Sequence, residues 1–328
     1  MMKLPRRNVL RLAAGAASLP AVSCIARAQE YPARPVRVIV PFAPGGQTDA
    51  IGRLIAQKLS ERLGQQFYVE NMPGAGGNIG AGRAAQSAPD GYTILVVDGI
   101  AFAANPSLYN RVPYDPIRDF DPITIAATTM IVLSVHEAFP ARTVQDLVAL
   151  IKANPAKYNY GSAGVGTGAH LTGELFRTSL GLDLVHVPYN GGGPAIAAAV
   201  AGHTPISFGS TAATIPQVKD GKLRALAVSG KKRLRELPDV PTMLDAGYAD
   251  VECDVWLGVM ASANTPKNII MLLSHEIVLA VAQPDLQERL VAFGFEAAHT
   301  TPNELAALIK SEVAKWAGVI RAAGMKPG

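Results

Sequence analysis

Apolar residues follow two different patterns near the start of the chain, and the change between them marks two elements. Val36–Val40 is a short run of β-branched residues, which is typical of a buried strand. Apolar residues then recur at helical spacing from Ile51 to Leu63 and stop at Gly64. The pattern predicts a strand, a tight loop and a helix in that order.

The loop between these two elements, residues 41–49, reads PFAPGGQTD. Its two consecutive glycines, Gly45 and Gly46, allow the backbone to approach a ligand without a Cβ in the way. The helix that follows presents unpaired N–H groups and a positive dipole end, which together suit an anion such as a carboxylate. For this loop alone, an ordinary turn with Thr48 or Asp49 capping the helix is an equally good interpretation.

Four further glycine-containing junctions lead from a predicted strand into a predicted helix, at residues 71–80, 161–170, 189–194 and 209–211. Strands that alternate with helices predict a mostly parallel α/β sheet, whose ligands bind beyond the carboxyl ends of the strands. Five junctions at the same topological position indicate an anion site lined by backbone groups. The glycines of residues 74–80 resemble a dinucleotide fingerprint only superficially, because they do not give G-x-G-x-x-G in register.

Two long β-like runs, Ile123–Val135 and Val251–Met260, divide the pattern into two lobes. Each run is long enough to pass from one sheet to another, so we interpret them as the outward and return crossings of a hinge. We expect residues 29–130 and 253–328 to form lobe 1 and residues 131–252 to form lobe 2.

The remaining segments are assigned from turn residues and helical spacing. Residues 98–100 are expected to be a loop, and the prolines of residues 105–122 predict an extended connection. Towards the end of the chain, two helices are expected at residues 267–282 and 303–323.

The first 28 residues have the features of an export signal. A twin-arginine start at Arg6–Arg11 precedes an alanine-rich apolar run over residues 12–22, and Ala26–Ala28 offers a small-x-small cleavage site. We expect cleavage near Ala28 and a periplasmic mature protein. The apolar run is too short to be a membrane anchor. Lipidation of Cys24 is kept as a minor alternative.

The basic balance of the chain comes from this signal. Five of the 30 basic residues and none of the 26 acidic residues lie in residues 1–28, so the rest of the chain carries 25 basic against 26 acidic residues. A nearly neutral mature protein lacks the electrostatic footprint of a nucleic-acid binder. Only Cys253 remains after cleavage, which leaves no intramolecular disulfide.

Motifs for catalysis and metal binding are missing from the sequence. It contains no G-x-S-x-G, H-E-x-x-H, C-x-x-C or Walker-type phosphate loop, and its six histidines lack metal-ligand spacing. We therefore predict no catalytic residue, no metal site and no cofactor. Only His170 lies where a ligand could reach it. Asp49 either stabilises a helix N-terminus beside Arg53 or receives a cationic or hydroxyl group.

Several short motifs, spread over the whole mature chain, resemble one known family in combination. They are Tyr31-Pro32 with Pro35-Val36, Pro41–Gly46 with Asp49, Glu70-Asn71 with Pro73–Asn78, Pro89–Thr93, Tyr160–Ser162, Val187–Tyr189 and Trp256–Gly258. The chain is similar to the Bug family, the TctC-like substrate-binding proteins of tripartite tricarboxylate transporters. The resemblance implies a type II periplasmic binding protein, with two α/β lobes joined by a two-segment hinge and a ligand cleft between them.

The resemblance also implies which residues bind the ligand. In lobe 1 it points to Phe42, Ala43, Gly45 and Gly46, with Asp49 orienting a ligand amine or a bridging water. In lobe 2 it points to Ser162, Ala163, Thr167, His170, Asn190, Gly191, Gly192, Ser210 and Thr211. Gln47-Thr48 and Asp98–Ile100 are positions where the family varies, which affects the identity of the ligand rather than its class.

These inferences together predict a non-enzymatic, monomeric receptor that closes over a small organic carboxylate and delivers it to integral membrane transporter subunits. Tricarboxylic, dicarboxylic, aromatic and amino acids all remain open as ligands. A ligand sensor for a signalling partner is one alternative. A nucleotide-dependent oxidoreductase is another, and it conflicts with export and with the broken fingerprint at residues 74–80.

Overall fold

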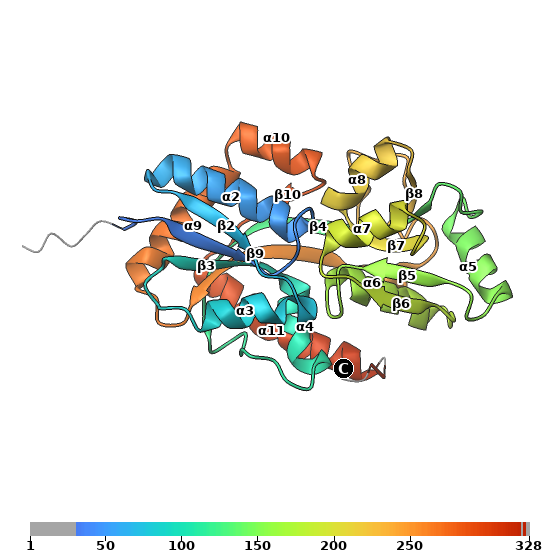
Figure 1. Cartoon of the computed structure of the whole chain (residues 1–328), viewed down its shortest axis with the longest axis horizontal. Helices are drawn as coiled ribbons and strands as arrows, with labels where there is room; N and C mark the ends of the chain where they lie inside the picture. The colour runs from blue at the N-terminus through green and yellow to red at the C-terminus, as the bar shows by residue number, and fades with distance from the viewer. Residues whose placement is uncertain (1–30, 323, 326–328) are drawn as a thin grey trace, which may run out of the picture. The chain divides into compact units, whose positions relative to one another are not determined.

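The computed structural model describes residues 31–322, 324 and 325. The chain divides into two compact units, residues 1–33 and 34–328, and the described helices and strands all belong to the second (Figure 1). The predicted export signal of residues 1–28, including its arginine pair and Cys24, lies outside the described residues.

Strands and helices alternate along most of the second unit. The strands are β1 (Val36–Val40), β2 (Phe67–Asn71), β3 (Thr93–Asp98), β4 (Phe120–His136), β5 (Asn159–Ser162), β6 (Val185–Pro188), β7 (Ile206–Ser210), β8 (Leu223–Val228), β9 (Asp254–Ser262) and β10 (Glu296–Ala297). The α-helices are α2 (Gln47–Leu63), α3 (Asn78–Ala85), α4 (Gly99–Leu108), α5 (Val144–Ala153), α6 (Gly168–Ser179), α7 (Gly192–Val200), α8 (Thr211–Lys219), α9 (Lys267–Val281), α10 (Pro284–Ala292) and α11 (Pro302–Ala322). Two 3₁₀ turns, η1 (Ala75–Gly77) and η2 (Ala249–Val251), complete the list.

The described strands are hydrogen-bonded in the order β2-β1-β3-β9-β4-β7-β5-β6, with β8 and β10 attached to β4. β1 pairs in parallel with β2 and β3, and β5 pairs in parallel with β6 and β7. These two parallel groups are joined by β9 and β4, which run antiparallel to each other and lie side by side between them (Figure 1).

The long strand β4 changes partners part-way along its length. Its residues Phe120–Met130 pair with β9, and residues Ile131–His136 pair with β7 and β8. The expected lobe boundary at residues 130 and 131 falls at this change of partner. The division of the chain into lobes stays a prediction, and the lobe names below follow it.

All five glycine junctions lead from a strand towards a helix, but the expectation for residues 98–108 was wrong. This segment is α4 and not a loop followed by an extended connection. Asp98 caps the helix by accepting hydrogen bonds from the backbone nitrogens of Ile100 and Ala101. Pro106 cannot donate to the carbonyl of Phe102, and the Tyr114 hydroxyl donates to that carbonyl instead, at 3.4 Å.

Two elements near the C-terminus were also missed. Helix α10 follows α9 after a short break, and β10 pairs with β4 through Glu296 and Ala297. A two-residue strand has no detectable period in a sequence, and α10 buries only Leu286 and Leu290.

The core of lobe 1 brings β1, β3 and β9 together with α4 and α11. Trp256 of β9 is buried in this cluster with Leu95, Phe102 and Leu305. A Cβ at Gly99 would overlap the indole ring, so the glycine at the first position of α4 lets this helix pack directly against Trp256. The packing fixes the N-terminus of α4 at the end of β3.

Candidate functional site

The loop between β1 and α2 is held in shape from behind by Asp49. Its carboxylate accepts hydrogen bonds from the Gly45 nitrogen at 3.1 Å and the Asn71 side-chain amide at 2.9 Å, and it forms an ion pair with Arg53 at 2.9 Å. Burial would raise the pKa of Asp49, but the bonds from Arg53, Asn71 and Gly45 outweigh it and hold this pKa below its usual value. The carboxylate is thus fully engaged in shaping the loop.

A second loop, between β5 and α6, is ordered by two hydroxyl groups. Thr167 caps α6, because its side-chain oxygen accepts from the His170 nitrogen at 3.3 Å, and its hydroxyl donates to the Gly164 carbonyl at 2.7 Å. Ser162 is completely buried and hydrogen-bonded to Nε2 of His186 at 2.6 Å. Both hydroxyls are therefore used within lobe 2.

His170 supports this loop from within lobe 2. Its Nδ1 accepts a hydrogen bond from the Gly166 nitrogen at 3.2 Å, and its ring centroid lies 4.2 Å from that of His186. Burial lowers the pKa of His170 to about 4 and that of His186 to about 3, and the neighbouring His170 adds to the second shift. Near neutral pH the pair is uncharged and offers no cation to a ligand.

Loops from the two lobes touch each other backbone to backbone. The Ala43 nitrogen donates to the Asn190 carbonyl at 2.9 Å. A Cβ placed on Gly46 would lie 3.1 Å from the Gly192 nitrogen, and one on Gly45 would lie 3.5 Å from the Cα of Gly193. The contact at Gly46 is tighter than a Cβ normally makes, so glycine at this position lets the two loops approach closely.

A small cavity of about 20 Å³ lies between these loops, and we call it the glycine-loop cavity. It is lined by Phe42, Gly46, Gln47, Thr48, Asp98, Ile131, Ala163, Thr167, Ala169, Gly192 and Ser210. Six of these residues, Phe42, Gly46, Ala163, Thr167, Gly192 and Ser210, were expected from the sequence to bind the ligand. The structure therefore brings predicted residues of both lobes to one place.

The other expected residues lie around this cavity without lining it. Ala43, Gly45, Asn190 and Gly191 belong to the two loops that touch, whereas Asp49, Ser162 and His170 support the loops from behind. Thr211 begins α8, and its hydroxyl is hydrogen-bonded to that of Thr129 at 2.8 Å. Whether these residues contact a ligand stays a prediction.

Sequence reasoning did not name Gln47, Thr48, Asp98, Ile131 or Ala169 as ligand-binding residues, although it expected the first three to affect the identity of the ligand. Gln47 and Asp98 are joined by a hydrogen bond of 2.9 Å from the side-chain amide to the carboxylate. A signal for Asp98 was present, because it ends a buried strand at the same topological position as the glycine junctions.

Helix N-termini supply the positive potential of this cavity. Residues that line it begin α2 and α7 or directly precede α4, α6 and α8, and no lysine or arginine is among the lining residues. Unpaired N–H groups and aligned dipoles at such ends favour a bound anion without any charged side chain. The site can therefore hold a carboxylate by its backbone.

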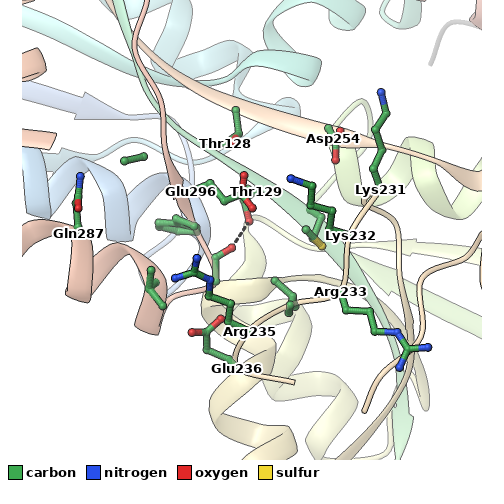
Figure 2. Close-up of a pocket in the computed structure, with 16 residues that line it drawn as sticks. Thr128, Thr129, Lys231, Lys232, Arg233, Arg235, Glu236, Asp254, Gln287 and Glu296 are labelled. Atoms are coloured by element: carbon green, nitrogen blue, oxygen red, sulfur yellow. Dashed lines mark hydrogen bonds between the residues drawn. The ribbon is translucent and has the colours of Figure 1, made fainter. Parts of the chain in front are cut away.

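A larger cavity of about 620 Å³ lies elsewhere, and we call it the basic cavity. Its lining includes Lys231–Glu236, Asp254, Gln287 and Gly294–Ala297. Figure 2 shows Lys232 and Arg235 pointing into this space and Arg233 pointing away, where it forms an ion pair with Asp245 at 2.9 Å.

The two cavities are lined by different residues of β4. Thr128, Thr129 and Met130 line the basic cavity, and Ile131 lines the glycine-loop cavity. Cations and carboxylates are mixed in the basic cavity, and none of the five glycine-junction loops contributes to it. The glycine-loop cavity is therefore the better candidate for a carboxylate despite its smaller volume.

Within residues 31–322, 324 and 325, no group of three or more histidine, cysteine or acidic side chains is arranged to hold a metal ion. Cys253 is buried, and burial raises the pKa of its thiol to about 12. In the same part of the chain no single helix meets the length and hydropathy needed to cross a membrane; α9 and α10 meet them only as a pair bent by 76°.

Comparison with known proteins decides the family. Residues 51–325 match the family described as "Tripartite tricarboxylate transporter family receptor", abbreviated TctC. The chain belongs to the TctC receptor family. The protein BugT of Bordetella pertussis is a relative with 36% identity, over 91% of this chain and 92% of BugT.

Solved structures of similar proteins agree with this assignment. The periplasmic binding protein BugD is 35% identical, with a TM-score of 0.88 over 91% of this receptor and all of BugD. The R. palustris protein Rpa4515 with adipate is 33% identical, with a TM-score of 0.88 and coverage of 91% and 100%. MatC from Rhodopseudomonas palustris with bound malate is 31% identical, with a TM-score of 0.84 and coverage of 88% and 100%.

The resemblance to the Bug and TctC family and the periplasmic binding protein fold are thus confirmed. The receptor is a periplasmic binding protein and not an enzyme, so the oxidoreductase alternative is wrong. The packing of the glycine loop at residues 74–80 is a physical reason against a bound nucleotide. A Cβ at Gly76 would overlap the Val165 carbonyl, and the Gly76 carbonyl accepts from Asn105 at 3.0 Å, so this loop packs against protein where a nucleotide would need room.

Proposed function

We propose that this receptor captures a small organic carboxylate in the glycine-loop cavity and delivers it to the membrane subunits of a tripartite tricarboxylate-type transporter. The observation that carries the proposal is the convergence of helix N-termini from both lobes on one cavity that has no cationic side chain, with those of α2, α7 and α8 not occupied by Asp98. The relatives with bound adipate and malate support a carboxylate as the ligand.

Binding requires the lobes to move. The cavity holds about 20 Å³, which is room for one water at most, so a dicarboxylate enters only when the loops lie further apart. We place the hinge at the two crossings near residues 130–131 and 252–253. Ser229 links both, because its side-chain oxygen accepts from the Ile131 nitrogen at 2.9 Å and donates to the Cys253 carbonyl at 2.6 Å.

The ligand is held, in this proposal, chiefly by backbone N–H groups of Gly46, Gln47, Ala163 and Gly192, with Phe42 and Ser210 completing the wall. Hydrogen bonds to a charged acceptor contribute roughly 1.5 to 3 kcal/mol each, which is enough for tight binding without a salt bridge. Asp49, Ser162 and His170 act indirectly by fixing the loops.

Residues 1–28 act as a twin-arginine export signal that is removed near Ala28, leaving a monomeric periplasmic protein. Intact-mass measurement of the protein from the periplasmic fraction tests this point. A mature chain beginning near Gln29 is expected, and retention of Arg6 and Arg7 in the periplasmic form would contradict it.

The function itself is tested by native mass spectrometry of the purified receptor, followed by calorimetry with a panel of carboxylates. We expect at least one small carboxylate to bind and to raise the melting temperature, and nucleotides to do neither. A receptor that binds no carboxylate in this panel would refute the proposal.

A further inference from the structure

Asp98 is a buried acidic residue that lines the glycine-loop cavity. One of its oxygens accepts from the Ile100 and Ala101 nitrogens, both at 3.1 Å, and the other accepts from the side-chain amide of Gln47 at 2.9 Å. The Gly168 nitrogen, at the first position of α6 in lobe 2, is a further backbone donor that lowers the pKa of this carboxylate. A single side chain thus connects the N-terminal ends of α2, α4 and α6.

Burial raises the pKa of Asp98, and the hydrogen bonds that it accepts oppose this rise. Because each of its partners is a donor, the arrangement favours the carboxylate over the protonated form. A protonated carboxyl group would need an acceptor for its own proton, and the four partners are three backbone N–H groups and one amide NH₂. The Asp98 carboxylate therefore already occupies the anion positions at the N-termini of α4 and α6. The N-termini of α2, α7 and α8 are left for a carboxylate of the ligand.

Two hydrogen-bonding atoms in the same cavity have no partner among the described residues. They are Oε1 of Gln47 and Oγ of Ser210, on side chains that are only 7% and 5% exposed. Because the Gln47 amide nitrogen donates to Asp98, its oxygen is the atom left for a ligand. An amide oxygen accepts only, so Gln47 adds a second acceptor next to the Asp98 carboxylate.

We propose that Asp98 and Gln47 select a carboxylate that also carries a hydrogen-bond donor, namely a 2-hydroxy or 2-amino acid, over the unsubstituted acid of the same length. This inference rests on the proposed carboxylate-binding function and narrows its ligand class. The ligand carboxylate lies at the N-termini of α2, α7 and α8, and its hydroxyl or ammonium group donates to the two acceptors. An unsubstituted dicarboxylate that fills the same space has no donor at this position and leaves Gln47 Oε1 unpaired.

The test is calorimetry of the full mature receptor with matched acids: succinate, malate and aspartate, then glutarate, 2-hydroxyglutarate and glutamate. We expect the substituted acid to bind at least about tenfold more tightly than the unsubstituted one within the series that fits. In Asp98→Asn, where the asparagine oxygen can still cap α4, the preference should fall to about threefold or less. The variant Asp254→Asn, which removes a carboxylate from the basic cavity, should keep the full preference.

Each result is decisive. Equal or tighter binding of the unsubstituted acid by the unaltered receptor would overturn the selection, while leaving the carboxylate-binding function in place. An unchanged preference in Asp98→Asn would overturn the assignment to Asp98. If neither series binds, the selection is overturned, and the wider carboxylate panel then decides the proposed function separately. Should Asp98→Asn not fold, Gln47→Met supplies the second variant, with the same loss of preference expected and the same contradiction if it is unchanged.

Discussion

Gly46 is a residue whose own backbone geometry would accept a side chain but whose surroundings would not. Its φ of −95° is ordinary for any residue, whereas a Cβ would lie 3.1 Å from the Gly192 nitrogen of the facing loop. We expect Gly46→Ala to leave the melting temperature of the unliganded receptor nearly unchanged and to weaken carboxylate binding at least about tenfold, because the added methyl group keeps the lobes apart.

The matched control for this prediction is Gly318→Ala. Gly318 lies in α11 with nothing within 4 Å of the added Cβ, so this variant should bind like the unaltered receptor. Calorimetry on both variants checks the prediction. Unweakened binding by Gly46→Ala would mean that the facing loops do not close on the ligand.

His170 and His186 make the stability of the receptor depend on pH. Their pKa values in the folded protein, about 4 and about 3, lie below the ordinary value of 6.5 because burial disfavours the imidazolium. Between pH 6.5 and 4 the unfolded chain therefore binds more protons, so stability is greatest above pH 6.5 and falls as the pH drops towards 4. We expect a loss of about 4 kcal/mol between pH 7 and 5, about half of it from each histidine.

Urea unfolding at several pH values measures this loss. Two charged groups also act on the pKa of His170: Glu174 raises it and Arg177 lowers it. Replacing His170 and His186 together by glutamine should flatten the pH dependence, whereas His275→Gln, at an exposed position of α9, should not. The same slope in both variants would place the titrating group elsewhere.

At the residue scale, sequence reasoning named the glycines as ligand-binding residues but gave Asp98 only as part of a variable position that affects the identity of the ligand. Gly46 and Gly192 could be predicted because a glycine pair between a strand and a helix is a local signal. The role of Asp98 depends on its contact with Gly168, a residue that lies 70 positions further along the chain and in the other lobe. No pattern within a window of sequence reports such a contact.

At the scale of elements, α5 depends on Thr143, the residue that caps its N-terminus. The Thr143 side chain accepts from the Asp146 nitrogen at 3.0 Å, and the Asp146 carboxylate accepts from the Thr143 nitrogen at 3.0 Å, which completes a capping box. We expect Thr143→Ala to lower the free energy of unfolding by about 1 kcal/mol without changing carboxylate affinity.

Urea unfolding and calorimetry check this prediction, with Thr178→Ala as the control. Thr178 is an exposed residue inside α6 whose hydroxyl bonds back to the Glu174 carbonyl at 2.6 Å, so alanine there should be neutral or slightly stabilising. Equal losses in both variants would show that the cap contributes nothing particular to α5.

The helix α4 was not predicted, because the hydrogen bond that Pro106 cannot make is replaced by one from a residue outside the helix. Pro106 indicates a break by every local rule, and yet α4 continues past it to Leu108. The Tyr114 hydroxyl takes the carbonyl that Pro106 leaves free, and the cap at Asp98 fixes the start of the helix. The position of α5, by contrast, followed from Thr143 and the apolar spacing behind it, which are local.

At the scale of the whole receptor, closure depends on contacts between the lobes that a ligand does not touch. Tyr109 directly follows the last residue of α4, and its hydroxyl donates to the Val165 carbonyl in the facing loop at 3.2 Å. Tyr109 does not line the glycine-loop cavity. A hydrogen bond that forms only when the lobes are closed increases the fraction of receptor molecules in the closed state. We expect Tyr109→Phe to weaken carboxylate binding about two- to tenfold.

Small-angle scattering and calorimetry together test this expectation. In Tyr109→Phe a larger share of unliganded molecules should be open, and a saturating carboxylate should still close them. Tyr68→Phe, at an exposed position of β2, is the control and should change neither quantity. Weaker binding without a shift in the open population would assign Tyr109 to the ligand site instead.

The central claim, that backbone amides of both lobes converge on one carboxylate, is tested most directly by NMR of receptor labelled with ¹⁵N-glycine. During titration with the tightest carboxylate, the amide signals of Gly46 in lobe 1 and Gly192 in lobe 2 should shift together and saturate at one equivalent. Gly294, which lines the basic cavity, should not shift. Shifts at Gly294 with Gly46 and Gly192 unmoved would contradict the account.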